Sequence, residues 1–280
     1  MSKVTAGVLL PIVLATASTY GSQAWVSSTR SSSGLLELYQ LDVSTGNSLG
    51  KLGDWAIEGT EEYGQVWDLA SAPNVYPNLL WGVTALDNDL LVIDPYQRRL
   101  ISSSKIDVSD PIYSLAMHPN GSLLYGATES SLLSIDPISG VVSSIGPLDG
   151  FPIIGLGFDS DGRLLGYDSV RELVQIDLSN ATTTVVVSWT RGIDYEDIAA
   201  HPEDGIVYLA EGLFTSSPNL STLDVDSMQV AQIGPLLTPA RAPVRVSGLA
   251  FTNVPEPAAA ISMMLGLASL LCHRAVGRRA

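Results

Sequence analysis

The 280-residue sequence contains one cysteine, Cys272, which lies near the C-terminus. An internal disulfide is therefore excluded, and so is a metal site built from several thiolates. Histidine is scarce as well, and two of the three histidines, His118 and His201, each precede a proline. This position favours a role in turns over a role in catalysis. The sequence also has no His-Glu-x-x-His pair and no glycine loop of the kind that cradles phosphates.

Basic residues are few. The chain has 14 Lys and Arg against 29 Asp and Glu, and residues 25–257 hold all 29 acidic residues with 10 basic ones. The net charge of this part is therefore −19. Such a surface repels phosphate groups, so we expect no binding to nucleic acid or to anionic lipid.

What the sequence does contain is a repeat. Residues 112–148 form four short apolar runs separated by turn signals, which is typical of antiparallel strands joined by hairpins. The end of this stretch, Ile145-Gly146-Pro147-Leu148, returns as Ile233-Gly234-Pro235-Leu236. A four-strand unit that returns every forty-odd residues is the signature of a β-propeller blade.

Two short patterns count the repeat. A small or polar residue, then Leu or Ile, then Ala or Gly occurs at 68–70, 114–116, 155–157, 197–199 and 248–250. An aliphatic residue followed by Asp occurs at 41–42, 93–94, 135–136, 176–177 and 223–224. The first Asp pair has no inner-strand pattern before it, and the last inner-strand pattern has no Asp pair after it. We therefore predict an all-β fold, a five-bladed β-propeller over residues 25–252, in which strand 246–251 closes the first blade.

Side chains alternate along a strand, so the inner-strand pattern also predicts what lies at the central axis. If the Leu or Ile points between blades, the residues on either side of it face the axis. The following residue is always Ala or Gly, which suits a crowded centre. The preceding residues, expected to line the same channel, are Asp68, Ser114, Gly155, Asp197 and Gly248.

The N-terminus has the layout of a secretory signal peptide, assigned to residues 1–24. One cation, Lys3, precedes an apolar stretch from Val4 to Ala17 that contains no acidic residue. Two cleavage patterns are available, one ending at Ala17 and one at Ala24. The second is favoured because the strand-like sequence then starts at Trp25; an uncleaved anchor is the alternative.

The last part of the chain, residues 253–280, differs in composition. Val254, Pro255, Glu256 and Pro257 precede fifteen uncharged residues, and Arg274, Arg278 and Arg279 follow. A helix over the uncharged residues would be about 22 Å long, shorter than the ~30 Å hydrocarbon core, although arginine side chains extend the span. The arginines would stay cytoplasmic and the acidic body outside.

This C-terminal layout resembles the PEP-CTERM sorting signal of exported Gram-negative bacterial proteins. The resemblance implies recognition and cleavage near Pro255 to Pro257 by an exosortase, after transient anchoring in the inner membrane. It also implies a place at the cell surface, associated with extracellular polysaccharide. A plain anchor that is never cleaved is the alternative. With a signal peptide at the other end, the leading hypothesis is a non-catalytic binding or matrix component.

The rival hypothesis is an exported hydrolase, either a glycosidase or a lactonase-like enzyme. Propeller enzymes of these kinds place carboxylates at the mouth of the channel, and Asp68, Asp197 and Glu196 are the best candidates. Glycoside chemistry needs two carboxyl groups within roughly 5–9.5 Å of each other. Lone Asp residues on inner strands more often accept hydrogen bonds from neighbouring strands, so the binding role is favoured.

Acidic residues gather in the loops that a propeller brings to one face. Such a face suits a divalent cation, a basic partner or a cation-bridged glycan, and the candidates for a Ca²⁺ site are Glu58, Glu61, Glu62, Asp107 and Asp110. The alternative is that these loops are simply solvated. A further calcium-like fragment, residues 159–162, aligns with the hairpin turn at 118–121 and is interpreted as a turn.

Overall fold

The structure is a computed structural model that describes residues 22–28, 37–51, 65–85, 87–189, 195–212 and 215–253. Within these ranges the chain forms twenty β-strands. No helix in this part of the chain is long and apolar enough to cross a membrane. Residues 254–280 of the predicted sorting segment, residues 1–21 of the predicted signal peptide, and Glu58, Glu61 and Glu62 lie outside the described residues.

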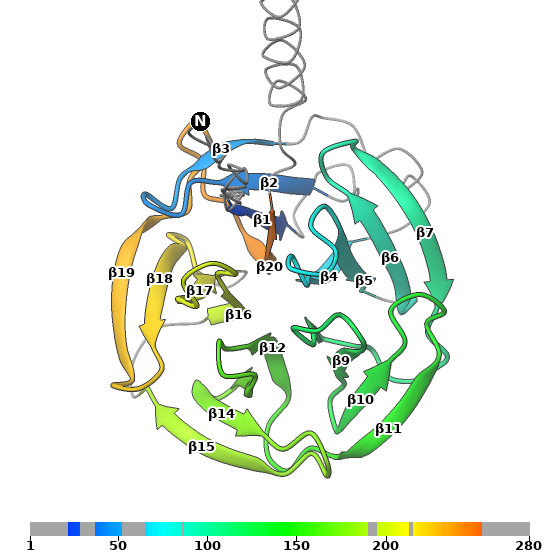
Figure 1. Cartoon of the computed structure of the whole chain (residues 1–280). Coiled ribbons are helices and arrows are strands. Elements are labelled where there is room, and N and C mark those ends of the chain that lie inside the picture. Colours follow the sequence, from blue (N-terminus) through cyan, green and yellow to red (C-terminus); the bar gives the residue numbers. More distant parts are fainter. Residues whose placement is uncertain are drawn as a thin grey trace, which may run out of the picture.

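The strands form five antiparallel four-stranded sheets arranged around a central axis (Figure 1). Named from the axis outward, the sheets are β20 (Val246–Asn253), β1 (Ser22–Ser28), β2 (Glu37–Leu41) and β3 (Ser48–Lys51); β4 (Val66–Ala70), β5 (Leu80–Thr84), β6 (Asp89–Asp94) and β7 (Arg99–Lys105); β8 (Ser114–Met117), β9 (Leu124–Ala127), β10 (Ser131–Ile135) and β11 (Val142–Pro147); β12 (Ile153–Phe158), β13 (Leu164–Asp168), β14 (Glu172–Ile176) and β15 (Thr183–Ser188); and β16 (Tyr195–Ala200), β17 (Val207–Glu211), β18 (Asn219–Asp224) and β19 (Gln229–Pro235).

The predicted five-bladed β-propeller is confirmed, including its closure. The inner strands contact one another in the order β4, β8, β12, β16, β20 and back to β4. In the closing blade β20 pairs with β1, from Ser22 opposite Asn253 to Ser28 opposite Val246. The indole nitrogen of Trp25 donates to the Thr252 hydroxyl at 2.7 Å across this seam. Because the first and last described strands share a sheet, the ring has no open edge between its ends.

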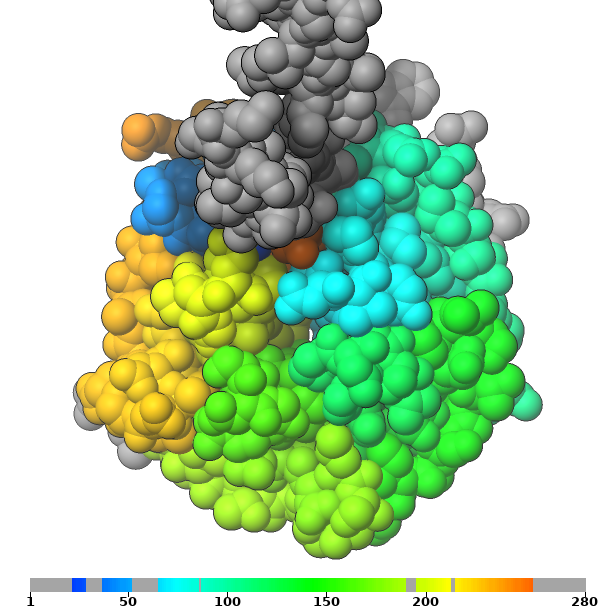
Figure 2. All heavy atoms as spheres, viewed as in Figure 1, coloured from blue at the N-terminus to red at the C-terminus, as the bar shows by residue number. Residues whose placement is uncertain are grey.

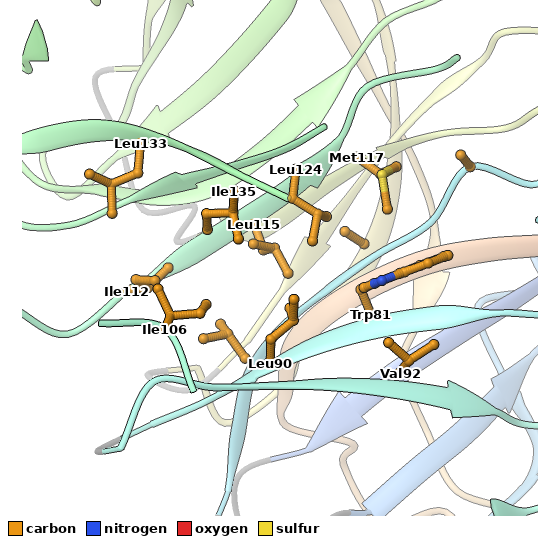
Figure 3. Close-up of a cluster of buried hydrophobic side chains, with 13 residues drawn as sticks. Trp81, Leu90, Val92, Ile106, Ile112, Leu115, Met117, Leu124, Leu133 and Ile135 are labelled. Carbon is orange, nitrogen blue, oxygen red and sulfur yellow. The ribbon is translucent and has the colours of Figure 1, made fainter. Parts of the chain in front are cut away.

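Each inner strand contributes its central Leu or Ile to a different hydrophobic core between blades, as the alternation predicted. These residues are Leu69, Leu115, Leu156, Ile198 and Leu249, and each belongs to its own cluster of buried side chains. Figure 3 shows the cluster around Leu115, where Trp81 and Leu90 of one blade meet Leu124 and Leu133 of the next. Figure 2 shows the blades packed directly against one another around the ring. Burial between blades thus supplies the main hydrophobic stabilisation.

The aliphatic-Asp pairs recur along the chain for a local reason: each Asp caps the hairpin between the two outer strands of its blade. The Asp136 carboxylate accepts hydrogen bonds from the backbone N–H groups of Ile138 and Ser139. The bond from the second residue after the Asp occurs in all five blades, at Asp42, Asp94, Asp136, Asp177 and Asp224. Such turns are the usual use of Asp after a strand.

The repeated Ile-Gly-Pro-Leu segments form joints between neighbouring blades. A Cβ on Gly146 would lie 2.5 Å from the carbonyl oxygen of Asn180, and one on Gly234 would lie 2.6 Å from that of Thr45. Asn180 and Thr45 both belong to the outer hairpin of the next blade. Glycine is therefore needed because only a residue without a side chain lets that hairpin approach the outer strand.

This contact predicts the effect of Gly146→Ala. The methyl group would meet backbone atoms that cannot move aside alone, so we expect a loss of about 1–3 kcal/mol in the free energy of unfolding. The matched control is Ser144→Ala in the same strand, where the side chain is exposed; a change within about 0.5 kcal/mol is expected there. Urea unfolding measures both variants. Equal midpoints for the two variants would show that the joint does not constrain the blades.

Candidate functional site

The axis of the ring holds a cavity of ≈ 380 Å³. The five small residues expected at the axis, Ala70, Ala116, Gly157, Ala199 and Ala250, all line this cavity. A Cβ on Gly157 would collide with the carbonyl oxygen of Ile198, so the inner strands approach as closely there as their backbones allow.

The layer below the cavity differs from the expectation of an open channel. Asp68, Ser114 and Asp197 are 0 % exposed. The two glycines of this layer are closed over by backbone: a Cβ on Gly248 would lie 2.5 Å from the Leu69 nitrogen, and one on Gly155 would lie 2.7 Å from the Glu196 carbonyl oxygen. The axis is therefore filled at this level, because two glycines let the strands close around two aspartates.

Asp68 and Asp197 do converge, and their oxygens bind the protein itself. Asp68 accepts hydrogen bonds from the backbone N–H groups of Leu69 and Leu115, both at 2.6 Å. Asp197 accepts hydrogen bonds from Ile198, at 2.7 Å, and from Leu249. The two carboxyl groups also share a hydrogen bond with each other. The pair thus connects β4 and β16 to each other and to β8 and β20, which are four of the five inner strands.

A hydrogen bond between two carboxyl groups requires a proton on one of them. Burial raises the pKa of Asp197 to about 8, and burial together with the charge of Asp197 raises the pKa of Asp68 well above its ordinary value. The four backbone donors stabilise one negative charge, whereas a second buried charge would repel it. The pair therefore keeps at least one proton at neutral pH, and one proton is enough to form the hydrogen bond between the two carboxyl groups.

Strand irregularities aim these side chains at the axis. The pairing register shifts between Val66 and Asp68 and between Tyr195 and Asp197, which places a β-bulge directly before each aspartate. Bulges redirect the side chains that follow them. Glu196, the third candidate of the hydrolase hypothesis, is the bulged residue of β16 and is 7 % exposed. Its side chain packs beside Gly212, and its charge adds to the raised pKa of Asp197.

The candidate metal residues that the structure describes, Asp107 and Asp110, are exposed in the connection between β7 and β8. Among the described residues, no group of three or more His, Cys, Asp or Glu side chains is arranged to hold a metal ion. The calcium-like fragment is a turn: the Asp159 carboxylate accepts hydrogen bonds from the Asp161 and Arg163 nitrogens and pairs with the Arg163 side chain at 2.6 Å.

The two histidines occupy equivalent turns and pack against aromatic rings. The His118 ring lies 5.2 Å from that of Phe158, and the His201 ring lies 5.2 Å from that of Phe251. In both cases the phenylalanine comes from the next blade, so the histidines help to join the blades.

One short sequence motif matches an enzyme signature but has a structural role here. Residues Gly46 to Gly50 read Gly-x-Ser-x-Gly, the pattern of a nucleophile elbow. That elbow requires a strand, a sharp turn and a helix. Here the segment joins β2 to β3, and the Ser48 hydroxyl accepts a hydrogen bond from the Gly50 nitrogen at 3.1 Å. The context therefore contradicts a catalytic serine at this position.

The comparisons with known proteins support the fold alone. No protein-family model and no curated protein matches the sequence. A chain in the crystal structure of a nidogen/laminin complex is similar with a TM-score of 0.52 and 10% identity, over 83% of this chain and 98% of the other. A Bacteroides caccae protein of unknown function is similar with a TM-score of 0.45 and 12% identity, over 75% of this chain and 72% of the other. Hydrazine synthase of Kuenenia stuttgartiensis is similar with a TM-score of 0.42 and 16% identity, over 70% of this chain and 59% of the other.

The shared proton predicts how stability depends on pH. In the unfolded chain an aspartate releases its proton near pH 4, whereas burial raises the pKa of Asp197 to about 8 and also raises that of Asp68, so the folded pair keeps a proton through neutral pH. The stabilisation from this proton is complete in acid and is lost as the pH rises through about 8. Asp42, Asp136, Asp177 and Asp224 act in the opposite sense, since hydrogen bonds lower their pKa, but they are fully ionised above about pH 6.

We therefore expect the melting temperature to fall between about pH 6 and pH 8.5, and to fall less in Asp197→Asn. The variant should be less stable overall, because an amide nitrogen cannot accept the backbone hydrogen bond that a carboxyl oxygen accepts. Asp107→Asn, at an exposed position, serves as the control and should keep the wild-type dependence. Parallel pH profiles for all three proteins would contradict the shared proton.

Proposed function

We propose that this chain is an exported, surface-sorted β-propeller that acts as a non-catalytic binding or extracellular-matrix component. The observation that carries the non-catalytic part is the burial of Asp68 and Asp197, both 0 % exposed. A glycosidase needs carboxyl groups that reach a substrate and stand apart by roughly 5–9.5 Å. These two carboxyl groups bond to each other and to four backbone N–H groups. They therefore hold the inner strands of the ring together and do not reach a substrate.

The sorting part of the proposal rests on the Val254 to Pro257 motif, the uncharged segment and the terminal arginines. The partners proposed on this basis are an exosortase, the inner membrane during passage, and a polysaccharide at the cell surface. The ring closure is compatible with such processing. Asn253 ends β20 opposite Ser22, and its backbone nitrogen donates to the Pro77 carbonyl oxygen at 2.8 Å. Cleavage near Pro257 would therefore leave the closing blade whole.

The closing blade also bears on the N-terminal cleavage site. Ala24 is 1 % exposed and pairs with both Leu41 and Phe251. The Gln23 amide donates to the Leu41 carbonyl oxygen at 3.0 Å. Cleavage after Ala24 would remove these residues from β1 and leave the end of β20 without a partner. We therefore propose cleavage after Ala17, the first of the two patterns in the sequence.

Intact-mass analysis of the protein from its producing bacterium tests both cleavages. The expected mature chain begins just after Ala17 and ends near Pro257. A surface fraction that retains Arg274, Arg278 and Arg279 would contradict sorting, and a mature chain that begins at Trp25 would contradict the N-terminal assignment.

Two assays separate the binding role from the hydrolase. The purified protein should co-sediment with extracellular polysaccharide from the same bacterium. It should also turn over chromogenic glycosides and lactones no faster than a folded Asp68→Asn variant does. Hydrolysis by the wild type that disappears in a folded Asp68→Asn variant would establish the enzyme instead.

A further inference from the structure

The axial cavity is closed at one end and opens at the other. Its walls come from all five inner strands. The layer of Asp68, Ser114, Gly155, Asp197 and Gly248 beneath it is buried and closes the axis. The opening lies at the hairpins that follow the inner strands, since Pro119, Ser160 and Glu203 are among the lining residues. This is a blind pocket of a size typical of small-molecule sites.

The walls of the pocket are apolar. Besides the small residues at the axis, they include Leu115, Met117, Phe158 and Phe251. Phe158 and Phe251 come from β12 and β20, and each stacks edge-on against a histidine. Apolar walls with a few polar groups at one end select a ligand with an apolar body and one polar head.

The rim of the pocket is acidic. Its polar lining includes His201, Glu203 and Asp204, and no Lys or Arg is among the described lining residues. Glu203 is exposed and accepts a hydrogen bond from the Ser22 hydroxyl at 3.0 Å. Asp204 is exposed and lies 2.9 Å from the His201 ring. The other acidic lining residue, Asp159, is neutralised by Arg163. A positively charged head group would be attracted to Glu203 and Asp204.

We propose that the axial cavity binds a small molecule with an apolar body and a cationic head group. The body lies against Ala70, Ala199 and Ala250, and the head lies at the rim beside Glu203. This inference deepens the proposed binding role and rests on it, because it names a ligand class and a place for it on the propeller.

Two probes that share one apolar body test the proposal: 4-phenylbutylamine, a cation at neutral pH, and 4-phenylbutyrate, an anion. Titration calorimetry with the full chain should show one molecule of the amine bound, at least about tenfold more tightly than the acid. Glu203→Gln should reduce this preference severalfold. Glu129→Gln is the control. It removes an exposed carboxylate from the hairpin between β9 and β10, which lies at the opposite end of the blades from the pocket opening, and it should leave the preference unchanged.

Filling the pocket gives a second readout. Ala199 is partly exposed and lines the cavity, so Ala199→Leu should weaken both probes by at least about tenfold. If that variant does not fold, the Glu203→Gln comparison decides alone. Equal affinity for the two probes, no binding at millimolar concentration, or a preference that Glu203→Gln leaves intact would overturn the proposal.

The outcome is separable from that of the proposed function. Co-sedimentation with polysaccharide that persists without probe binding would overturn the cavity site alone. Probe binding without co-sedimentation would instead overturn the matrix role and leave the cavity site standing.

Discussion

The structure depends on a proton shared by two carboxyl groups at the centre of the ring. Asp68 and Asp197 are fully buried, and the pair receives hydrogen bonds from four backbone N–H groups on four inner strands. Two buried negative charges would drive these strands apart, whereas one charge and one proton hold them together. The glycines of β12 and β20 allow the strands to close around the pair. The same arrangement that stabilises the ring removes these carboxyl groups from any substrate.

At the periphery, two of the five blades are joined to the next through a glycine in their outer strand, where the absence of a side chain lets the neighbouring hairpin approach. Gly146 and Gly234 accept the outer hairpin of the following blade, and an Asp at the start of each outer hairpin holds the turn in shape. Hydrophobic cores between the blades provide the remaining contacts that join neighbouring blades. Because the last strand completes the first blade, these contacts form one closed ring that carries a blind axial pocket.

The sequence predicted this fold well because a repeat provides five independent observations of one unit. The blade count, the closing strand and the small residues at the axis all followed from spacing and alternation. That Asp68 and Asp197 accept hydrogen bonds from neighbouring strands was also expected, but their contact with each other was not. Alternation places both side chains at the axis, as the structure confirms, but the β-bulge before each aspartate cannot be read from the spacing. Whether two such residues meet, and whether water reaches them, depends on packing across the ring, as does the acidic rim formed by Glu203 and Asp204.

The central claim is that one proton remains on the Asp68–Asp197 pair at neutral pH. Carbon-13 NMR of the aspartate side-chain carboxyl groups measures this directly, with Asp68→Asn and Asp197→Asn used to assign the two signals. We expect one carboxyl of the pair to stay protonated through neutral pH and to release its proton only near pH 8 or above. Two signals that both titrate near pH 4, as exposed aspartates do, would contradict the account.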